Sequence, residues 1–300
     1  MTPTSSTIGE IYSLGCALIW AVAVILFRKS GERIPPVALN LFKNTVALAL
    51  FFITLPLLGV TLAPAGVSTF DWVALALSGV LGIGVADSLF FVALNRIGAG
   101  NTAIVDSLYS PFVILCAWAG LGEHIGPAVL AAMALMTGAI LVGTWEPGQR
   151  TRHADRRGMI GGVLIGVLSI LLMAGGLVIM KPILSHADPW WVTTVRLIAG
   201  TVFIAVQAML PRHRASVRQC FRPGSHWRTA IPAAIVGTYL AMITWIVGLK
   251  YTFASRASIL NQTSSIFVIL LAALFLGEKL TARRGVAVAL AIGGTVLATR

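Results

Sequence analysis

Two aspartates lie inside apolar stretches of this chain, where a carboxylate is costly and therefore informative. Asp87 lies in GVADSLFF and Asp106 in TAIVDSLY, and Lys43 lies in a third apolar stretch, LFKNTVAL. An ionised group at the centre of a membrane helix costs on the order of 3 kcal/mol, so such residues face a partner or a wet cavity. One cation and two carboxylates predict an ion pair and one carboxylate left to bind a proton or a cationic substrate group.

The composition indicates a membrane protein. Hydrophobic residues make up 57% of the 300 positions and charged residues only 11%, whereas roughly a quarter of a soluble protein is charged. Apolar stretches long enough to cross the bilayer recur along the whole chain. We therefore expect an all-α integral membrane protein with ten transmembrane helices, at about 8–28, 36–58, 71–94, 99–121, 127–145, 158–181, 188–210, 228–250, 255–276 and 283–299.

The three charged residues are expected at one depth. At ~1.5 Å per helical residue, each lies roughly 10 to 12 Å from the same membrane surface. If the third and fourth spans form an antiparallel hairpin about residue 97, Asp87 and Asp106 can face each other with Lys43 nearby. Two interpretations remain open. Either Lys43 and one aspartate clamp helices together while the second stays neutral, or the excess carboxylate binds a proton or substrate during a cycle.

Basic residues predict the orientation. The net charge of +12 is spread over loops, which indicates membrane topology rather than nucleic-acid binding. Four loop or terminal cations lie on one side: Lys181, Lys250, Arg256 and Arg300. Sixteen lie on the other, which we expect to be cytoplasmic: Arg28, Lys29, Arg33, Arg96, Arg150, Arg152, Arg156, Arg157, Arg212, Arg214, Arg218, Arg222, Arg228, Lys279, Arg283 and Arg284. Both termini are then periplasmic in a bacterial inner membrane.

The two halves of the sequence repeat each other. At an offset of 155, FVIL (112–115) meets FVIL (267–270) and LGEH (121–124) meets LGEK (276–279). At an offset of 153, Pro36 meets Pro189, Lys43 meets Arg196 and Arg28 meets Lys181. Five spans per half is odd, so the second copy must be inverted, as in many transporters. We expect a first repeat at 1–147, a basic cytoplasmic linker at 148–157 and an inverted second repeat at 158–300.

The motifs resemble a known family. A Trp midway along the first span (LIWAVAV), a basic residue early in spans 2 and 7, and LGE at the end of spans 4 and 9 are similar to EamA-type members of the drug/metabolite transporter superfamily. The resemblance implies that spans 1–4 and 6–9 surround a central substrate cavity and that spans 5 and 10 are peripheral. It implies export of amino acids, other metabolites or drugs. This chain departs from the common pattern in its two acidic residues in spans 3 and 4 and its uncharged connection between spans 2 and 3.

Polar residues at helical spacing predict the cavity wall. Arg196 has no evident acidic partner, so it either anchors a substrate carboxylate through its planar guanidinium or caps helix-end carbonyls. The other residues that we expect to line the site, with Lys43, Asp87 and Asp106, are Trp20, Asn40, Tyr109, Ser110, Tyr239, Trp245, Asn261, Gln262 and Ser265.

These features predict a secondary transporter rather than an enzyme. We expect a proton-coupled antiporter that exports a small polar metabolite, such as an amino acid or a cationic compound, as a monomer or homodimer in the lipid bilayer. No nucleotide-binding loop and no metal-ligand spacing is present in the sequence, so we expect no cofactor and no metal. A multidrug or polyamine exporter of the same fold is one alternative. An intramembrane aspartyl protease using Asp87 and Asp106 is another, although the YD and GxGD motifs of such enzymes are missing.

Overall fold

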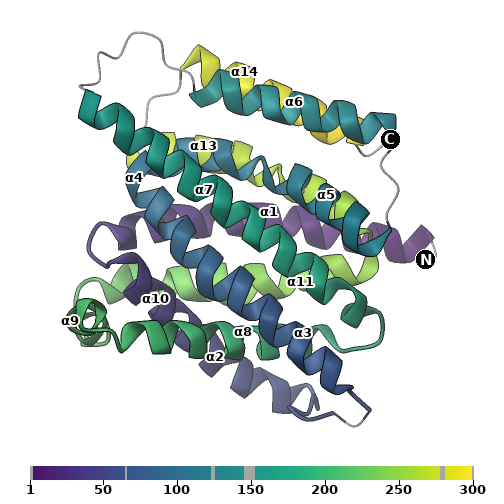
Figure 1. Ribbon diagram of the computed structural model, residues 1–300, viewed down its shortest axis with the longest axis vertical. Coiled ribbons are helices and arrows are strands. Elements are labelled where there is room, and N and C mark those ends of the chain that lie inside the picture. Colours follow the sequence, from purple (N-terminus) through teal and green to yellow (C-terminus); the bar gives the residue numbers. More distant parts are fainter. Residues whose placement is uncertain (1–2, 65, 123–125, 145–152, 278–280, 299–300) are drawn as a thin grey trace.

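A computed structural model of the chain describes residues 3–64, 66–122, 126–144, 153–277 and 281–298. All regular elements within these residues are helical, which confirms the predicted fold class (Figure 1). They are α1 (Pro3–Gly31), α2 (Pro36–Leu57), α3 (Thr69–Gly79), η1 (Val80–Val85), α4 (Ala86–Asp106), α5 (Tyr109–Leu121), α6 (Pro127–Thr144), α7 (His153–Met180), η2 (Lys181–Ser185), α8 (Pro189–Ala208), α9 (Pro211–Cys220), α10 (Trp227–Ala233), η3 (Ala234–Leu240), α11 (Ala241–Tyr251), α12 (Ala254–Asn261), α13 (Ser264–Leu276) and α14 (Ala282–Ala298).

Seven helical stretches within the described residues are long and apolar enough to cross a membrane. Ten continuous spans were expected, but two of them are broken. The predicted fourth span is divided between α4 and α5, and the ninth between α12 and α13. Gly98, with φ 81°, interrupts the helix near the expected hairpin at residue 97. Part of the predicted linker, 148–152, lies outside the described residues.

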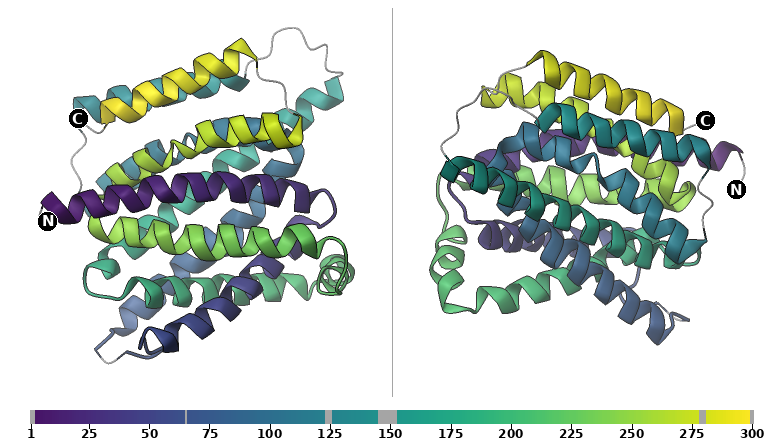
Figure 2. Two further views of the ribbon diagram at one scale, coloured as in Figure 1. Left: turned by 180° about the vertical axis from the view of Figure 1, so that it is seen from behind. Right: turned by 45° about the horizontal axis from the view of Figure 1, so that its top comes forward.

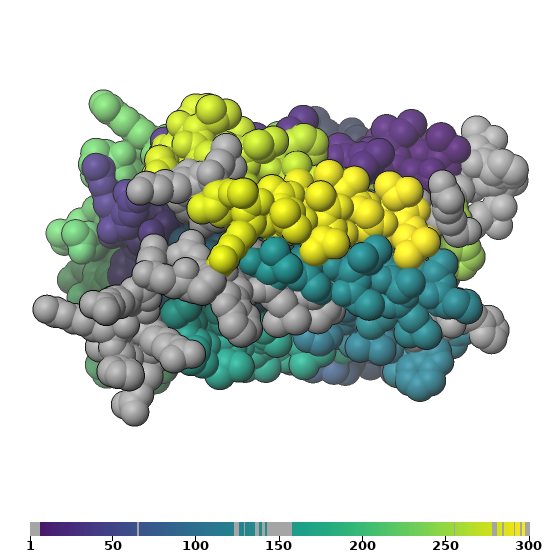
Figure 3. Space-filling view, turned by 90° about the horizontal axis from the view of Figure 1, so that it is seen from above, coloured from purple at the N-terminus to yellow at the C-terminus, as the bar shows by residue number. Residues whose placement is uncertain are grey.

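The helices form a main bundle with a two-helix layer beside it. α6 packs chiefly against α14, and both have few contacts with the other helices. Figures 1 and 2 show this pair as a separate layer over α5 and α13, and Figure 3 shows it covering one face. The two chain ends lie at one end of the bundle, and α9 lies at the other (Figure 1). The layer therefore has little part in forming the interior of the bundle.

The irregular segments recur in both repeats at an offset of 155. η1 and η3 are π-helical segments with wider turns, and they lie in the third and eighth spans. The breaks after Asp106 and Asn261 occupy matching positions, and so do Gly122 and Gly277, which end α5 and α13 in the left-handed conformation. Such a conformation favours glycine. The duplication therefore extends to departures from regular helix.

Two cations also have matching contacts. Arg28, at the end of α1, donates to the carbonyl oxygen of Asn95 at 3.3 Å. Lys181, its counterpart at an offset of 153, donates to the carbonyl oxygen of Thr252 at 2.7 Å and also to that of Leu249. Each cation therefore binds carbonyl groups near the end of another span, where helical backbone acceptors lack partners.

Residues 211–227 were expected to form a loop between two spans, but the structure forms α9 there. This helix carries three arginines, and its last residue, Cys220, is 3% exposed. Val217 is half-buried and packs against the apolar residues around α2. A short basic segment forms a helix here because its few apolar side chains pack against the bundle.

Candidate functional site

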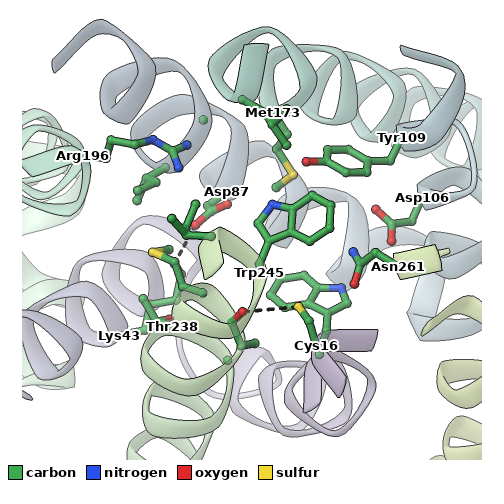
Figure 4. Close-up of a pocket in the computed structure, with 18 residues that line it drawn as sticks. Cys16, Lys43, Asp87, Asp106, Tyr109, Met173, Arg196, Thr238, Trp245 and Asn261 are labelled. Carbon is green, nitrogen blue, oxygen red and sulfur yellow. Dashed lines mark hydrogen bonds and ion pairs between the residues drawn. The ribbon is translucent and has the colours of Figure 1, made fainter. Parts of the chain in front are cut away.

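A cavity of about 140 Å³ lies between the two repeats at mid-bundle. It has room for on the order of ten water molecules. Figure 4 shows charged, aromatic and sulfur-containing side chains around it. The residues that line it are Cys16, Trp20, Lys43, Gly82, Ile83, Asp87, Asp106, Tyr109, Met173, Leu177, Arg196, Gly237, Thr238, Ala241, Met242, Trp245, Ile246 and Asn261.

Most of the lining comes in pairs related by the repeat. At an offset of 153, Trp20 corresponds to Met173 and Lys43 to Arg196. At an offset of 155, the pairs are Gly82 with Gly237, Ile83 with Thr238, Asp87 with Met242 and Asp106 with Asn261. The cavity therefore lies at the junction of the two repeats. Its chemistry is nevertheless asymmetric, because both carboxylates come from the first repeat.

Lys43 forms a buried ion pair with Asp87. Its Nζ lies 2.6 Å from Asp87 Oδ2, and the two side chains are 4% and 15% exposed. Nζ also donates to Asn44 Oδ1 at 2.9 Å and lies 5.7 Å from the centre of the Phe91 ring. These contacts join the second and third spans. The predicted Lys–Asp pair therefore forms, and Asp87 is the partner.

Asn40 supports the third span rather than lining the cavity. Its Nδ2 donates to the carbonyl oxygen of Ile83 at 3.1 Å and to Ser88 Oγ at 2.9 Å. The carbonyl of Ile83 belongs to η1, where wider turns displace the regular helical hydrogen bonds. Asn40 thereby stabilises the irregular segment that precedes Asp87.

Arg196 is 7% exposed and extends from α8 to the cavity. Its Nε donates to Ser78 Oγ at 2.8 Å, and its Nη1 lies 3.0 Å from Met180 Sδ. Within the described residues it makes no ion pair and caps no carbonyl group, and its Nη2 is close to Gly82. The guanidinium is held at one edge with donors left for a ligand.

Asp106 lies on another wall of the cavity from Asp87. Figure 4 shows the labelled Trp245 between the two aspartates and Asn261 beside Asp106. The side chain of Asp106 makes no ion pair or hydrogen bond to Lys43 or Asp87 within the described residues. The expectation that the two aspartates face each other around Lys43 is therefore not met. Asp87 is held by Lys43, and Asp106 faces the cavity separately.

The broken helices place Asp106 and Asn261. α4 ends at Asp106 and α12 at Asn261, so the negative ends of two helix dipoles lie at this wall. Gln262 Nε2 donates to the carbonyl oxygen of Asp106 at 3.0 Å, which joins the breaks. Asn261 Oδ1 has no hydrogen-bond partner within the described residues. This wall therefore suits a cation.

Aromatic side chains complete the wall near Asp106. Tyr109 and Trp245 have ring centres 6.1 Å apart, and Trp20 lines the cavity from α1. Tyr239 was expected here but lies outside, where its hydroxyl is 2.6 Å from Thr54 Oγ1. The faces of the Trp20, Tyr109 and Trp245 rings can attract an organic cation.

Of the thirteen predicted residues, eight line the cavity and five do not. Ser110, Gln262 and Ser265 join the fourth and ninth spans, with partners Ser258, Asp106 and Ala103, whereas Asn40 and Tyr239 make the contacts described above. Cys16, Met173 and Thr238 line the cavity but were not predicted, and of these only Met173 matches a predicted residue, Trp20, in the other repeat. Helical spacing alone could not separate the cavity face from the contact between spans.

An all-helical membrane protein with two repeats around a central cavity that contains charged side chains has the architecture of a transporter. The sequence model of the EamA-like transporter family matches residues 7–145 and 160–300. This chain therefore belongs to that family, within the drug/metabolite transporter superfamily. A solved structure titled "Crystal structure of protein" shares 19% identity, with a TM-score of 0.72 over 97% of each chain, and supports the fold. No curated protein matches the sequence.

Proposed function

We propose that this protein is a secondary transporter that exports a small zwitterion, such as an amino acid, by exposing the central cavity to each side of the membrane in turn. The observation that supports this most directly is the pair Arg196 and Asp106. Both line the cavity, they carry opposite charges, and neither makes an ion pair within the described residues. A substrate carboxylate at Arg196 and an ammonium group at Asp106 would complement both. Export is the direction that family membership favours.

Counterflow in liposomes tests the substrate class. Liposomes that contain the purified protein and a high internal concentration of one amino acid should take up a labelled amino acid against its gradient. Arg196→Lys should weaken apparent affinity for amino acids about tenfold or more, because an ammonium lacks the planar fork of guanidinium. Arg212→Lys, on the exposed surface of α9, is the matched control. Unchanged affinity in Arg196→Lys would remove the carboxylate assignment.

Proton coupling is assigned to Asp106. Asp87 is held by Lys43, whereas Asp106 faces the cavity without such a cation. Asp106→Asn imitates the protonated side chain, so it should lose accumulation driven by a pH gradient. Substrate exchange should persist with weaker apparent affinity, because an amide forms no ion pair with the substrate ammonium group. Asn261→Ala, on the same wall, should retain gradient-driven accumulation and serves as the control. Accumulation at the parent level in both Asp87→Asn and Asp106→Asn would contradict proton coupling.

The aromatic wall favours an organic-cation exporter as the second candidate. Trp20, Tyr109 and Trp245 surround the side of the cavity that holds Asp106. Polyamines and cationic drugs belong in the same counterflow screen. Exchange of these compounds with no exchange of amino acids would favour the second candidate. The exchange of cations should then be insensitive to Arg196→Lys. An aspartyl protease is disfavoured because Lys43 holds one of the two carboxylates, which such an enzyme needs to share a proton.

A further inference from the structure

A second hollow lies at the end of the bundle that carries α9, outside the central cavity. It has a volume of about 390 Å³. Arg33 and Pro35 from the turn between α1 and α2 form one wall, and Ser216 and Gln219 of α9 form another. His226, just before α10, completes it. Figures 1 and 2 both show α9 beside the α1–α2 turn, opposite the two chain ends.

Hydrogen bonds fix the walls of this hollow. Arg33 Nη1 donates to Ser225 Oγ at 3.2 Å, which joins the α1–α2 turn to the segment before α10. His226 Nε2 and Trp227 Nε1 both donate to the carbonyl oxygen of Cys220, at 2.9 and 3.0 Å. Two ring N–H groups on one buried carbonyl hold the turn after α9 in place. The hollow is therefore a defined pocket and not only a gap between loops.

The pocket has positive charge and many hydrogen-bond donors. A guanidinium has five N–H groups, and the described contact of Arg33 uses one of them. Arg218 and Arg222 belong to the adjoining helix and turn. Burial raises the pKa of the Cys220 thiol to about 11, so this wall adds no thiolate charge at neutral pH. Glu32 is the one carboxylate of the α1–α2 turn, and it makes no ion pair within the described residues.

Exposed apolar side chains place the pocket at the membrane surface. Met209 and Leu210, just before α9, are 66% and 43% exposed, and Phe221, just after it, is 38% exposed. Between them lie the arginines of α9. A short basic helix with exposed apolar residues at both ends suits the headgroup region of a bilayer. Phosphate is the anion present there, and it accepts several hydrogen bonds from guanidinium groups.

We propose that the pocket between Arg33 and His226 binds a phosphate ester, with an acidic phospholipid headgroup as its source. Its walls come from both repeats, since Arg33 belongs to the first and α9 to the second. A bound headgroup would therefore link the repeats at this end of the bundle. The site is independent of the substrate proposed for the central cavity.

Thermal stability of the full-length protein in detergent tests the proposal. Dioctanoyl phosphatidylglycerol should raise the Tm in a saturable way, and dioctanoyl phosphatidylcholine should do so less than half as much. Arg33→Gln should raise the half-saturating concentration of phosphatidylglycerol at least fivefold, and Arg33→Lys by a smaller factor. Arg212→Gln removes the same charge from exposed α9 outside the pocket, and should change it less than twofold.

Inorganic phosphate, with ionic strength matched by chloride, separates the two sources of the anion. An Arg33-dependent rise in Tm with phosphate alone would support the pocket chemistry without the lipid tail. Equal weakening by Arg33→Gln and Arg212→Gln would show diffuse attraction to a basic surface and would overturn the proposal. So would the absence of a saturable rise with either probe in the parent protein.

Discussion

Lys43 and Asp87 are predicted to contribute to stability mainly as a pair. Removing one partner of a buried ion pair leaves the other charge without compensation, at a cost of about 3 to 5 kcal/mol. We expect Lys43→Met to lower the apparent Tm strongly, and Asp87→Leu added to it to restore most of the loss. Thermal unfolding of the three proteins in one detergent measures this. A double variant no more stable than Lys43→Met would show that the pair has another role, such as binding substrate.

Several residue contacts could be predicted from the sequence, and others could not. An unpaired charge inside an apolar span is costly, so the pairing of a lysine with an aspartate could be predicted from that free-energy cost alone. Which of the two aspartates pairs with Lys43 depends on how the second, third and fourth spans pack, and helical spacing does not show that packing. Arg196 rests against Ser78 and Met180, which are neutral residues on other helices. Sequence spacing does not reveal such partners.

At the scale of elements, the contact between α3 and α8 depends on a glycine. A Cβ at Gly79 would overlap the carbonyl oxygen of Arg196, so the backbones of the two helices could not approach as closely. A Cβ at Gly175, on α7, would have no atom within 4 Å. Both positions are helical, so alanine brings the same gain in helix propensity of about 1 kcal/mol.

We therefore predict that Gly79→Ala lowers the apparent Tm and impairs transport, whereas Gly175→Ala leaves the Tm unchanged or raises it. Overpacking of a close contact costs about 1 to 3 kcal/mol, which exceeds the gain in propensity. Thermal unfolding and the counterflow assay report the difference. Equal behaviour of the two variants would mean that α3 and α8 do not need this close approach.

The breaks in the fourth and ninth spans show why element boundaries were missed. Pro111 lacks an N–H group and its ring crowds the carbonyl group of Ser107, so a bend is expected in the fourth span, but residues 256–276 of the ninth span contain no proline or glycine. The breaks are also stabilised across the bundle, since Gln262 and Ser265 donate to carbonyl groups of Asp106 and Ala103. Hydrogen-bond partners about 160 residues away do not appear in a local pattern. The repeat, by contrast, could be read directly because it survives in sequence.

At the scale of the whole molecule, an aromatic cluster closes the bundle between the cavity and the α9 end. Phe27, Phe90 and Phe91 are at most 2% exposed, and Phe27 packs with a ring-centre distance of 5.0 Å to Phe91. A Cβ at Gly237 would lie 2.5 Å from the Phe27 ring, so this contact also joins the two repeats. At the other end, Met180 and Gly82 occupy the matching positions, and the guanidinium of Arg196 contacts both.

We predict that the contact between Phe27 and Gly237 opens during transport. In a background free of other cysteines, a short bis-methanethiosulfonate cross-linker that bridges Phe27→Cys and Gly237→Cys should stop counterflow, and a reductant should restore it. Phe27→Cys alone should stay active after the same treatment. Counterflow that continues with the cross-link fully formed would show that this end of the bundle does not open there.

The orientation in the membrane is predicted from charge. Both chain ends lie at one end of the bundle, and the basic α9 lies at the other (Figure 1). If the basic end is cytoplasmic, as the distribution of arginine and lysine favours, a C-terminal alkaline phosphatase fusion should be active in bacteria and a C-terminal green fluorescent protein fusion dark. The reverse result would place the termini in the cytoplasm.

The peripheral layer of α6 and α14 bears on why the two repeats have opposite orientations in the membrane. Each half has one helix in this layer, and no described residue of either helix lines the central cavity. Four crossings per half would leave both copies facing the same way, whereas a fifth reverses the second copy. The helix with the least contact with the substrate path therefore decides whether each half crosses the membrane an odd or an even number of times. A gene that lost 282–300 would keep every described residue of the cavity wall and deliver its C-terminus to the opposite face of the membrane.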